Sequence, residues 1–178
     1  MTKPTKQGKS ARISATHQEK NPSSQEINTL VARFTEGRYT EAATLAQAMT
    51  VRFPMHGFGW MLLGAVFNQT GRSADALVPL QKAAALLPSD AMVLGNLGNT
   101  LKDLGRLDEA EASYRRALEI KPDYVGAHYN LGNTLKELGR LDEAEASYRR
   151  ALEIKPDFAE AYINLGVILR NLSRLDEA

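Results

Sequence analysis

The chain has 178 residues, of which 43% are hydrophobic and 24% are charged, as is usual for a folded globular protein. It contains no cysteine, which excludes a disulfide scaffold, a thiolate zinc site and a cysteine nucleophile. The net charge of +1 favours no class of partner, and no apolar run approaches the roughly 18 residues that a membrane helix needs.

The first 22 residues form a basic segment with almost no large apolar side chains. Such a segment buries too little surface to offset the entropy of ordering, so we expect a disordered tail. It lacks the apolar central region of a signal peptide, which favours a cytoplasmic protein. Its basic residues favour a solubilising role over contact with nucleic acid; they are Lys3, Lys6, Lys9, Arg12 and Lys20.

An internal repeat organises the rest of the chain. Four of the seven prolines are spaced 34 residues apart: Pro54, Pro88, Pro122 and Pro156. A period of this length is typical of a solenoid or array. Residues 96–123 recur at 130–157 with one change, from Asp103 to Glu137, which a duplication or a designed consensus would explain. We divide the chain into a tail at 1–22, a divergent unit at 23–56, full units at 57–90, 91–124 and 125–158, and a truncated unit at 159–178 with its first helix only.

Each unit is predicted to be a helical hairpin. Ser23 and Glu26 have the spacing of a capping box, so the first helix begins there. In the third unit, apolar residues recur at helical spacing over 91–104 and 107–120. Gly105 between these stretches suits a helix end with left-handed geometry. Pro122 ends the second helix, and Asp123 is predicted to cap the next one.

The apolar face of each hairpin must be buried by stacking on its neighbours, which predicts an all-α solenoid. Gly98 and Ala110 are small because helix axes approach closely there. Pro79 is expected to kink the second helix of its unit. The predicted core of the third unit comprises Leu94, Leu97, Gly98, Leu101, Leu104, Ala110, Tyr114, Ala117 and Leu118.

Residues 57–178 resemble the tetratricopeptide repeat, and residues 23–56 resemble it more weakly. The resemblance rests on Trp60, Leu63, Gly64, Phe67, Gly71, Ala76, Ala83 and Pro88 and on their counterparts in later units. It implies a right-handed α-solenoid with a concave groove that binds peptides.

The face of the first helix that points away from the core, at positions 2, 5, 6, 9, 12 and 13 of each unit, carries a series of asparagines. Stacked amides can bond a peptide backbone without reading its sequence. The array resembles the repeats of O-linked N-acetylglucosamine transferases, although inherited consensus explains the asparagines equally simply. The candidate site is Asn96, Asn99, Asn130, Asn133, Asn164, Lys102, Lys136, Arg170 and Tyr129.

A carboxylate clamp of the kind that binds chaperone tails needs lysine four residues before the asparagine, where Gly95 and Tyr129 stand. We expect Glu111, Arg115 and Glu119 to form solvated pairs along one helix. His128 occupies the position of Trp60 and is expected to be half-buried at a packing site. Paired arginines such as Arg115, Arg116, Arg149 and Arg150 are a weaker candidate for an anionic partner.

We expect a non-catalytic scaffold with a protein or peptide partner, and no cofactor, metal, membrane or nucleic acid. One alternative is the substrate-recruiting portion of a larger transferase, such as a glycosyltransferase, sulfotransferase or methyltransferase. The other is a structural array that self-associates through its open carboxy-terminal end. Such an end would expose part of the apolar face of 159–172.

Overall fold

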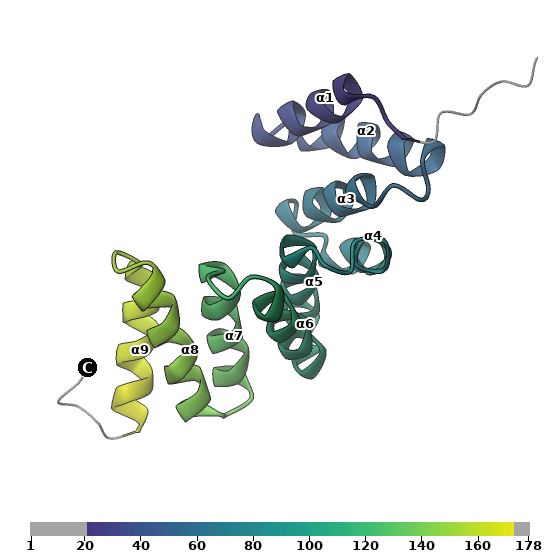
Figure 1. Cartoon of the computed structure of the whole chain (residues 1–178). Helices are drawn as coiled ribbons and strands as arrows, with labels where there is room; N and C mark the ends of the chain where they lie inside the picture. Colours follow the sequence, from purple (N-terminus) through teal and green to yellow (C-terminus); the bar gives the residue numbers. More distant parts are fainter. Residues whose placement is uncertain (1–20, 173–178) are drawn as a thin grey trace, which may run out of the picture.

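The computed structural model describes residues 21–172, and this part of the chain is built from α-helices without strands (Figure 1). Most of the predicted tail at 1–22 and the end of the unit at 159–178 lie outside it. Within these residues, no helix is both long and apolar enough to cross a bilayer. The helices are α1 (Ser24–Thr35), α2 (Tyr39–Arg52), α3 (Gly57–Gln69), α4 (Ser73–Leu86), α5 (Ala91–Asp103), α6 (Leu107–Ile120), α7 (Val125–Glu137), α8 (Leu141–Ile154) and α9 (Ala159–Asn171).

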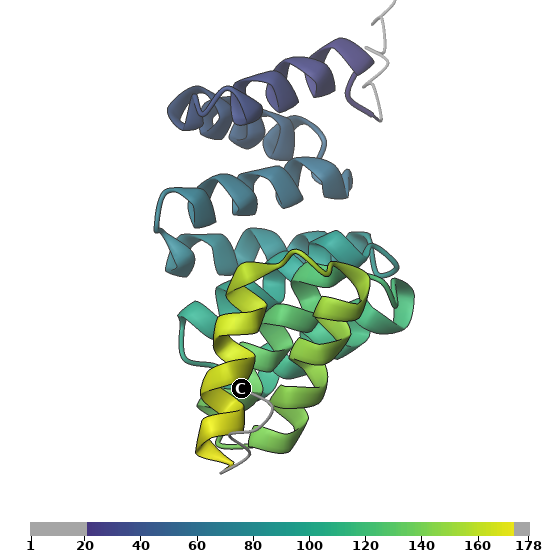
Figure 2. The ribbon, with the colours of Figure 1, turned by 90° about the vertical axis from the view of Figure 1, so that its left-hand side faces the viewer.

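The helices form antiparallel pairs that stack one after another along a curved path (Figures 1 and 2). Every helix contacts the next one in the chain, and α3 contacts α5 as α5 contacts α7. The helices α3, α5, α7 and α9 begin at residues 57, 91, 125 and 159, at intervals of 34. This arrangement confirms the predicted helical solenoid.

The helix ends follow the sequence signals with one exception. The Ser23–Glu26 capping box is present, and Gly105 adopts a φ of 72°, which glycine tolerates without strain. Asp123 does not cap α7, whose N-cap is Tyr124. The capping position is one residue later in the repeat, where Asp90 accepts bonds from two backbone amides of α5. The prediction for Asp123 is therefore wrong by one residue.

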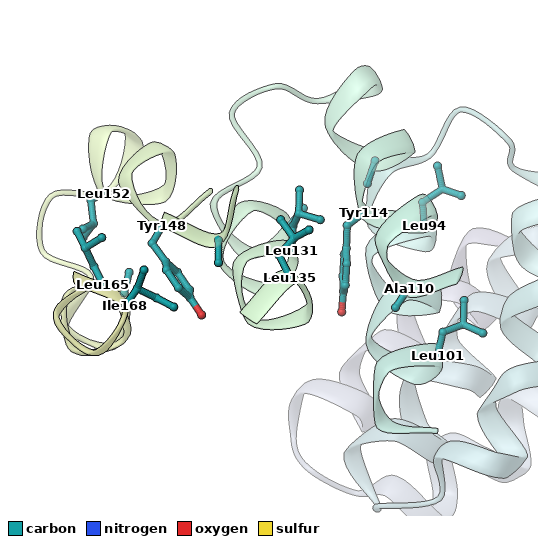
Figure 3. Close-up of a cluster of buried hydrophobic side chains, with 14 of the residues drawn as sticks. Leu94, Leu101, Ala110, Tyr114, Leu131, Leu135, Tyr148, Leu152, Leu165 and Ile168 are labelled. Carbon is teal, nitrogen blue, oxygen red and sulfur yellow. The ribbon is translucent and has the colours of Figure 1, made fainter. Parts of the chain in front are cut away.

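The core is continuous through the third and later units and is centred on two tyrosines. Tyr114 and Tyr148 are fully buried among leucines of α5, α7 and α9 (Figure 3). Each ring lies against a glycine, since a methyl group on Gly98 would approach Cε1 of Tyr114 to 2.6 Å. The equivalent distance from Gly132 to Tyr148 is 2.7 Å. These glycines therefore make room for the aromatic rings.

Some core predictions need correction. Leu104 is 36% exposed because it sits at the end of α5, where the chain leaves the stack. Val93 and Thr100 are fully buried although they lie off the predicted core face. The first helix of a unit packs against the preceding hairpin as well as its own partner, so it buries two faces. The helix α4 continues through Pro79, and the kink expected there stays a prediction.

A matched pair of substitutions tests the role of these glycines. We expect Gly98→Ala to lower the free energy of unfolding by about 1–3 kcal/mol, because the buried ring of Tyr114 must shift. Gly166 occupies the same repeat position in α9, and no atom of residues 21–172 outside its own stretch of helix lies within 4 Å of a methyl group added there. Gly166→Ala should raise the free energy of unfolding by up to about 1 kcal/mol through helix propensity. Urea denaturation followed by circular dichroism measures both, and equal effects would contradict the packing role.

Candidate functional site

A groove of about 530 Å³ lies along the first helices of consecutive units. Helices α1, α3, α5 and α7 contribute its walls, and α3 contacts α5 as α5 contacts α7. Within the full units, its lining residues occupy repeat positions 2, 5, 6, 9, 12 and 13. The lining residues are Phe34, Met61, Leu62, Ala65, Asn68, Gln69, Met92, Asn96, Asn99, Lys102, Asp103 and Asn130.

The structure brings only part of the predicted site into this groove. Four of the candidate residues line it: Asn96, Asn99, Lys102 and Asn130. The others lie farther along the array on α7 and α9 and do not line it: Tyr129, Asn133, Lys136, Asn164 and Arg170. The apolar lining residues of α1 and α3 are not among the predicted site residues, because the prediction rests on the polar side chains and Tyr129 of the later units.

The asparagines also bond to the fold itself. Oδ1 of Asn99 accepts a hydrogen bond of 2.7 Å from the hydroxyl of Tyr114 and one of 2.8 Å from Nδ2 of Asn130. We call such a set of bonds, here among Asn99, Tyr114 and Asn130, a rung. Each rung joins a first helix to its own second helix and to the next unit. The side-chain oxygen of Asn99 is therefore committed to the fold.

Burial keeps the tyrosines in the donor state. Desolvation raises the pKa of the Tyr114 hydroxyl well above its ordinary value, and it does the same for Tyr148. A protonated phenol donates to Asn99, so the amide oxygen faces the tyrosine and Nδ2 faces the other way. Among the described residues, Nδ2 of Asn99 has no hydrogen-bond partner. It remains a donor available at the groove.

The next rung repeats this pattern with additional bonds. Oδ1 of Asn133 accepts from Tyr148 at 2.8 Å and from Asn164 at 3.0 Å. Nδ2 of Asn164 also lies 3.1 Å from the hydroxyl of Tyr129, and its Oδ1 accepts from Lys136 at 3.3 Å. The candidates at this end of the array thus bond mainly to one another.

Asn96 differs from its counterparts Asn130 and Asn164. Those two asparagines donate to an asparagine of the preceding unit, but the equivalent residue for Asn96 is Ala65, which offers no acceptor. Within residues 21–172, the side chain of Asn96 has no hydrogen-bond partner. Its amide is half-buried in the groove and able to bond a ligand through both its oxygen and its nitrogen.

Glu111 on the second helix of its unit is less solvated than the sequence predicts, whereas Arg115 and Glu119 are exposed. The Glu111 side chain is only 13% exposed and accepts from Arg115 at 2.8 Å and from Arg140 of the next unit at 2.6 Å. Burial opposes the charge of Glu111, but these bonds lower the pKa of its carboxyl below the ordinary value. Arg150 pairs with Glu153 at 2.6 Å. These pairings argue against an anion site there.

The side chain of His128 packs at a junction between units. Nε2 of His128 lies 2.9 Å from the carbonyl oxygen of Pro122, just as Nε1 of Trp60 donates to Pro54 at 2.9 Å. Its half-buried place at the junction between units is the one predicted. In the part of the chain that the structure describes, no group of three acidic or histidine residues could hold a metal ion.

A double-mutant cycle tests the rung at Asn99. We expect Asn99→Ala to lower the free energy of unfolding by about 1–3 kcal/mol, because the buried hydroxyl of Tyr114 loses its acceptor. Adding Tyr114→Phe removes that unsatisfied group, so the double variant should be less unstable than the sum of the single variants. Additive effects in urea denaturation would contradict the rung.

Comparison with solved structures identifies similar folds. MamA has 25% identical residues and a TM-score of 0.77, over 82% of this chain and 85% of MamA. YrrB, described as a TPR protein with an unusual peptide-binding site, has 20% identity and a TM-score of 0.75, over 90% and 82%. The first TPR domain of Spaghetti (RPAP3), bound to the HSP90 peptide SRMEEVD, has 23% identity and a TM-score of 0.64, over 66% and 93%.

Family models match most of the described chain. A model described as "TPR repeat" matches residues 98–139 and 132–172, and one described as "Tetratricopeptide repeat" matches residues 31–91. No curated protein sequence matches. These findings do not support the resemblance to O-linked N-acetylglucosamine transferases in particular. They do agree with the stacked helical hairpins of the described residues. The chain belongs to the tetratricopeptide repeat family.

Proposed function

We propose that this protein is a non-catalytic scaffold that holds an extended peptide segment in the groove along α3, α5 and α7. The observation that carries the proposal is the amide of Asn96, which lies in the groove without a partner among the described residues. A half-buried amide with unused bonding capacity is costly unless a ligand or water completes it. A peptide backbone offers the complementary groups.

The neighbouring rung supports the same ligand. Asn99 directs an unpartnered Nδ2 donor toward the groove, since its oxygen is held by Tyr114 and Asn130. A carbonyl oxygen of an extended peptide can accept from it, while Asn96 can both donate and accept. Bonds of this kind read the backbone and tolerate many side chains.

Two fold neighbours bind peptides according to their descriptions, YrrB and the Spaghetti domain. Their likeness supports a peptide as the class of ligand. The chaperone-tail mode is disfavoured here, because Gly95 and Tyr129 stand where the clamp needs lysine. None of these similar proteins favours the alternative in which this array recruits substrates for a transferase, although the same groove would serve that role.

Two asparagine variants at the same repeat position test the proposal. An array of random-sequence peptides selects the tightest binder of the unaltered protein, and fluorescence anisotropy measures its affinity for each variant. We expect Asn96→Ala to weaken binding about three- to tenfold, the equivalent of one or two hydrogen bonds. Unfolding by urea should hardly change, because Asn96 makes no side-chain bond within residues 21–172.

The matched control is Asn164→Ala. It removes bonds to Asn133, Tyr129 and Lys136, so it should lower stability while leaving the affinity unchanged. Failure of the unaltered protein to bind any peptide, or unchanged affinity in a folded Asn96→Ala variant, would contradict the proposed function.

A further inference from the structure

We infer that the groove selects an uncharged peptide segment with large aliphatic side chains, which it seats on an apolar wall beside the free amide of Asn96. The apolar wall comprises Phe34, Met61, Leu62, Ala65 and Met92. This inference rests on the proposed function and adds the class of peptide that the same groove takes.

The apolar wall exists because the second unit departs from the repeat. In the third and fourth units, positions 6 and 9 are asparagines, whereas in the second unit they are Leu62 and Ala65. The alanine at position 9, Ala65, also removes the acceptor that would have bonded Asn96. The groove is therefore apolar along α3, at the place where α5 has an unused amide.

The exposure of Met92 indicates that the apolar wall is incomplete without a ligand. Its side chain is 54% exposed although it lines the groove, whereas Met61 beside it is buried. A ligand side chain that covers Met92 gains apolar burial. Thioether side chains are flexible and polarizable, so this wall can adapt to leucine, isoleucine or methionine alike.

The charges of the groove cancel, which favours an uncharged segment. Nζ of Lys102 lies 3.8 Å from Oδ1 of Asp103, and both residues line the groove. The remaining polar lining consists of amides, and Asn68 among them already accepts a bond from Thr100 at 3.0 Å. An acidic peptide would meet Asp103, and a basic one would meet Lys102.

The spacing of the helices sets a register for the segment. The apolar wall lies mainly on α3 and the free amides on α5, and packed helix axes are about 10 Å apart. An extended chain rises about 3.3 Å per residue. The aliphatic side chain should therefore lie about three residues from the backbone group that Asn96 holds.

Three short probes, acetylated and fluorescently labelled, distinguish these features. The first is an amidated serine–glycine peptide with two leucines, and the second replaces both leucines by serine. The third carries the leucines but ends in acidic residues and a free carboxylate. We expect the unaltered protein to bind the leucine probe about tenfold more tightly than the serine probe, and the acidic probe no more tightly than the leucine probe.

Matched variants place this preference on the apolar wall. Met92→Ser should reduce the preference for leucine about threefold or more, whereas Met55→Ser, at an exposed site outside the groove, should leave it unchanged. Ala65→Asn supplies an acceptor for Asn96 and makes the wall polar, so it should also weaken binding of the leucine probe. Ala112→Asn, the same change on the exposed side of α6, is its control.

The outcomes separate the two proposals. Equal affinity of the unaltered protein for the leucine and serine probes, with both weakened by Asn96→Ala, would overturn the apolar selection and leave the proposed function standing. Tighter binding of the acidic probe would overturn the preference for an uncharged segment. An absence of binding by all three probes, together with no hit on the random peptide array, would overturn both proposals.

Discussion

The packing of a tyrosine ring on a glycine of the partner helix is the contact on which the third and fourth units depend. Tyr114 fills the space that Gly98 leaves, and its hydroxyl donates a hydrogen bond to Asn99, the residue that follows Gly98. The same side chain thus closes the hairpin, buries its own polar group and orients an amide. Because that amide also bonds to Asn130, the contact extends into the next unit and couples packing within a hairpin to stacking between hairpins.

This coupling divides the asparagines into two kinds. Those whose oxygen and nitrogen are bonded within the array hold the units together, as Asn164 does. Asn96 stands at a unit boundary where the rung is missing, because Ala65 and Leu80 replace the asparagine and tyrosine of later units. A break in the repeat therefore creates the position with the most unused bonding capacity. In an array of near-identical units, such departures are the places where ligand chemistry can arise.

Much of the fold could be predicted from periodicity, since helix positions follow from residues that act locally. The capping box at Ser23 and the left-handed glycine at Gly105 are examples. Predictions of which side chains are buried were less accurate, because burial depends on contacts with other hairpins. Thr100 is buried by the preceding hairpin, and Glu111 is covered by an arginine 29 residues later. Both contacts join residues that are far apart in the sequence, so local periodicity does not reveal them. Periodicity predicted one buried face for each helix, whereas the stack buries a second face as well.

The sequence by itself determined the all-α repeat, its 34-residue interval and the helix face on which a groove could form, because helical periodicity and turn residues express themselves over a few positions. Only the tertiary structure decided which amides remain available. A hydrogen bond between Asn99 and Asn130 spans 31 residues and depends on how two hairpins stack. Identical asparagines in the sequence therefore differ in chemistry, since each side chain's capacity is set by the partners that the stack brings to it.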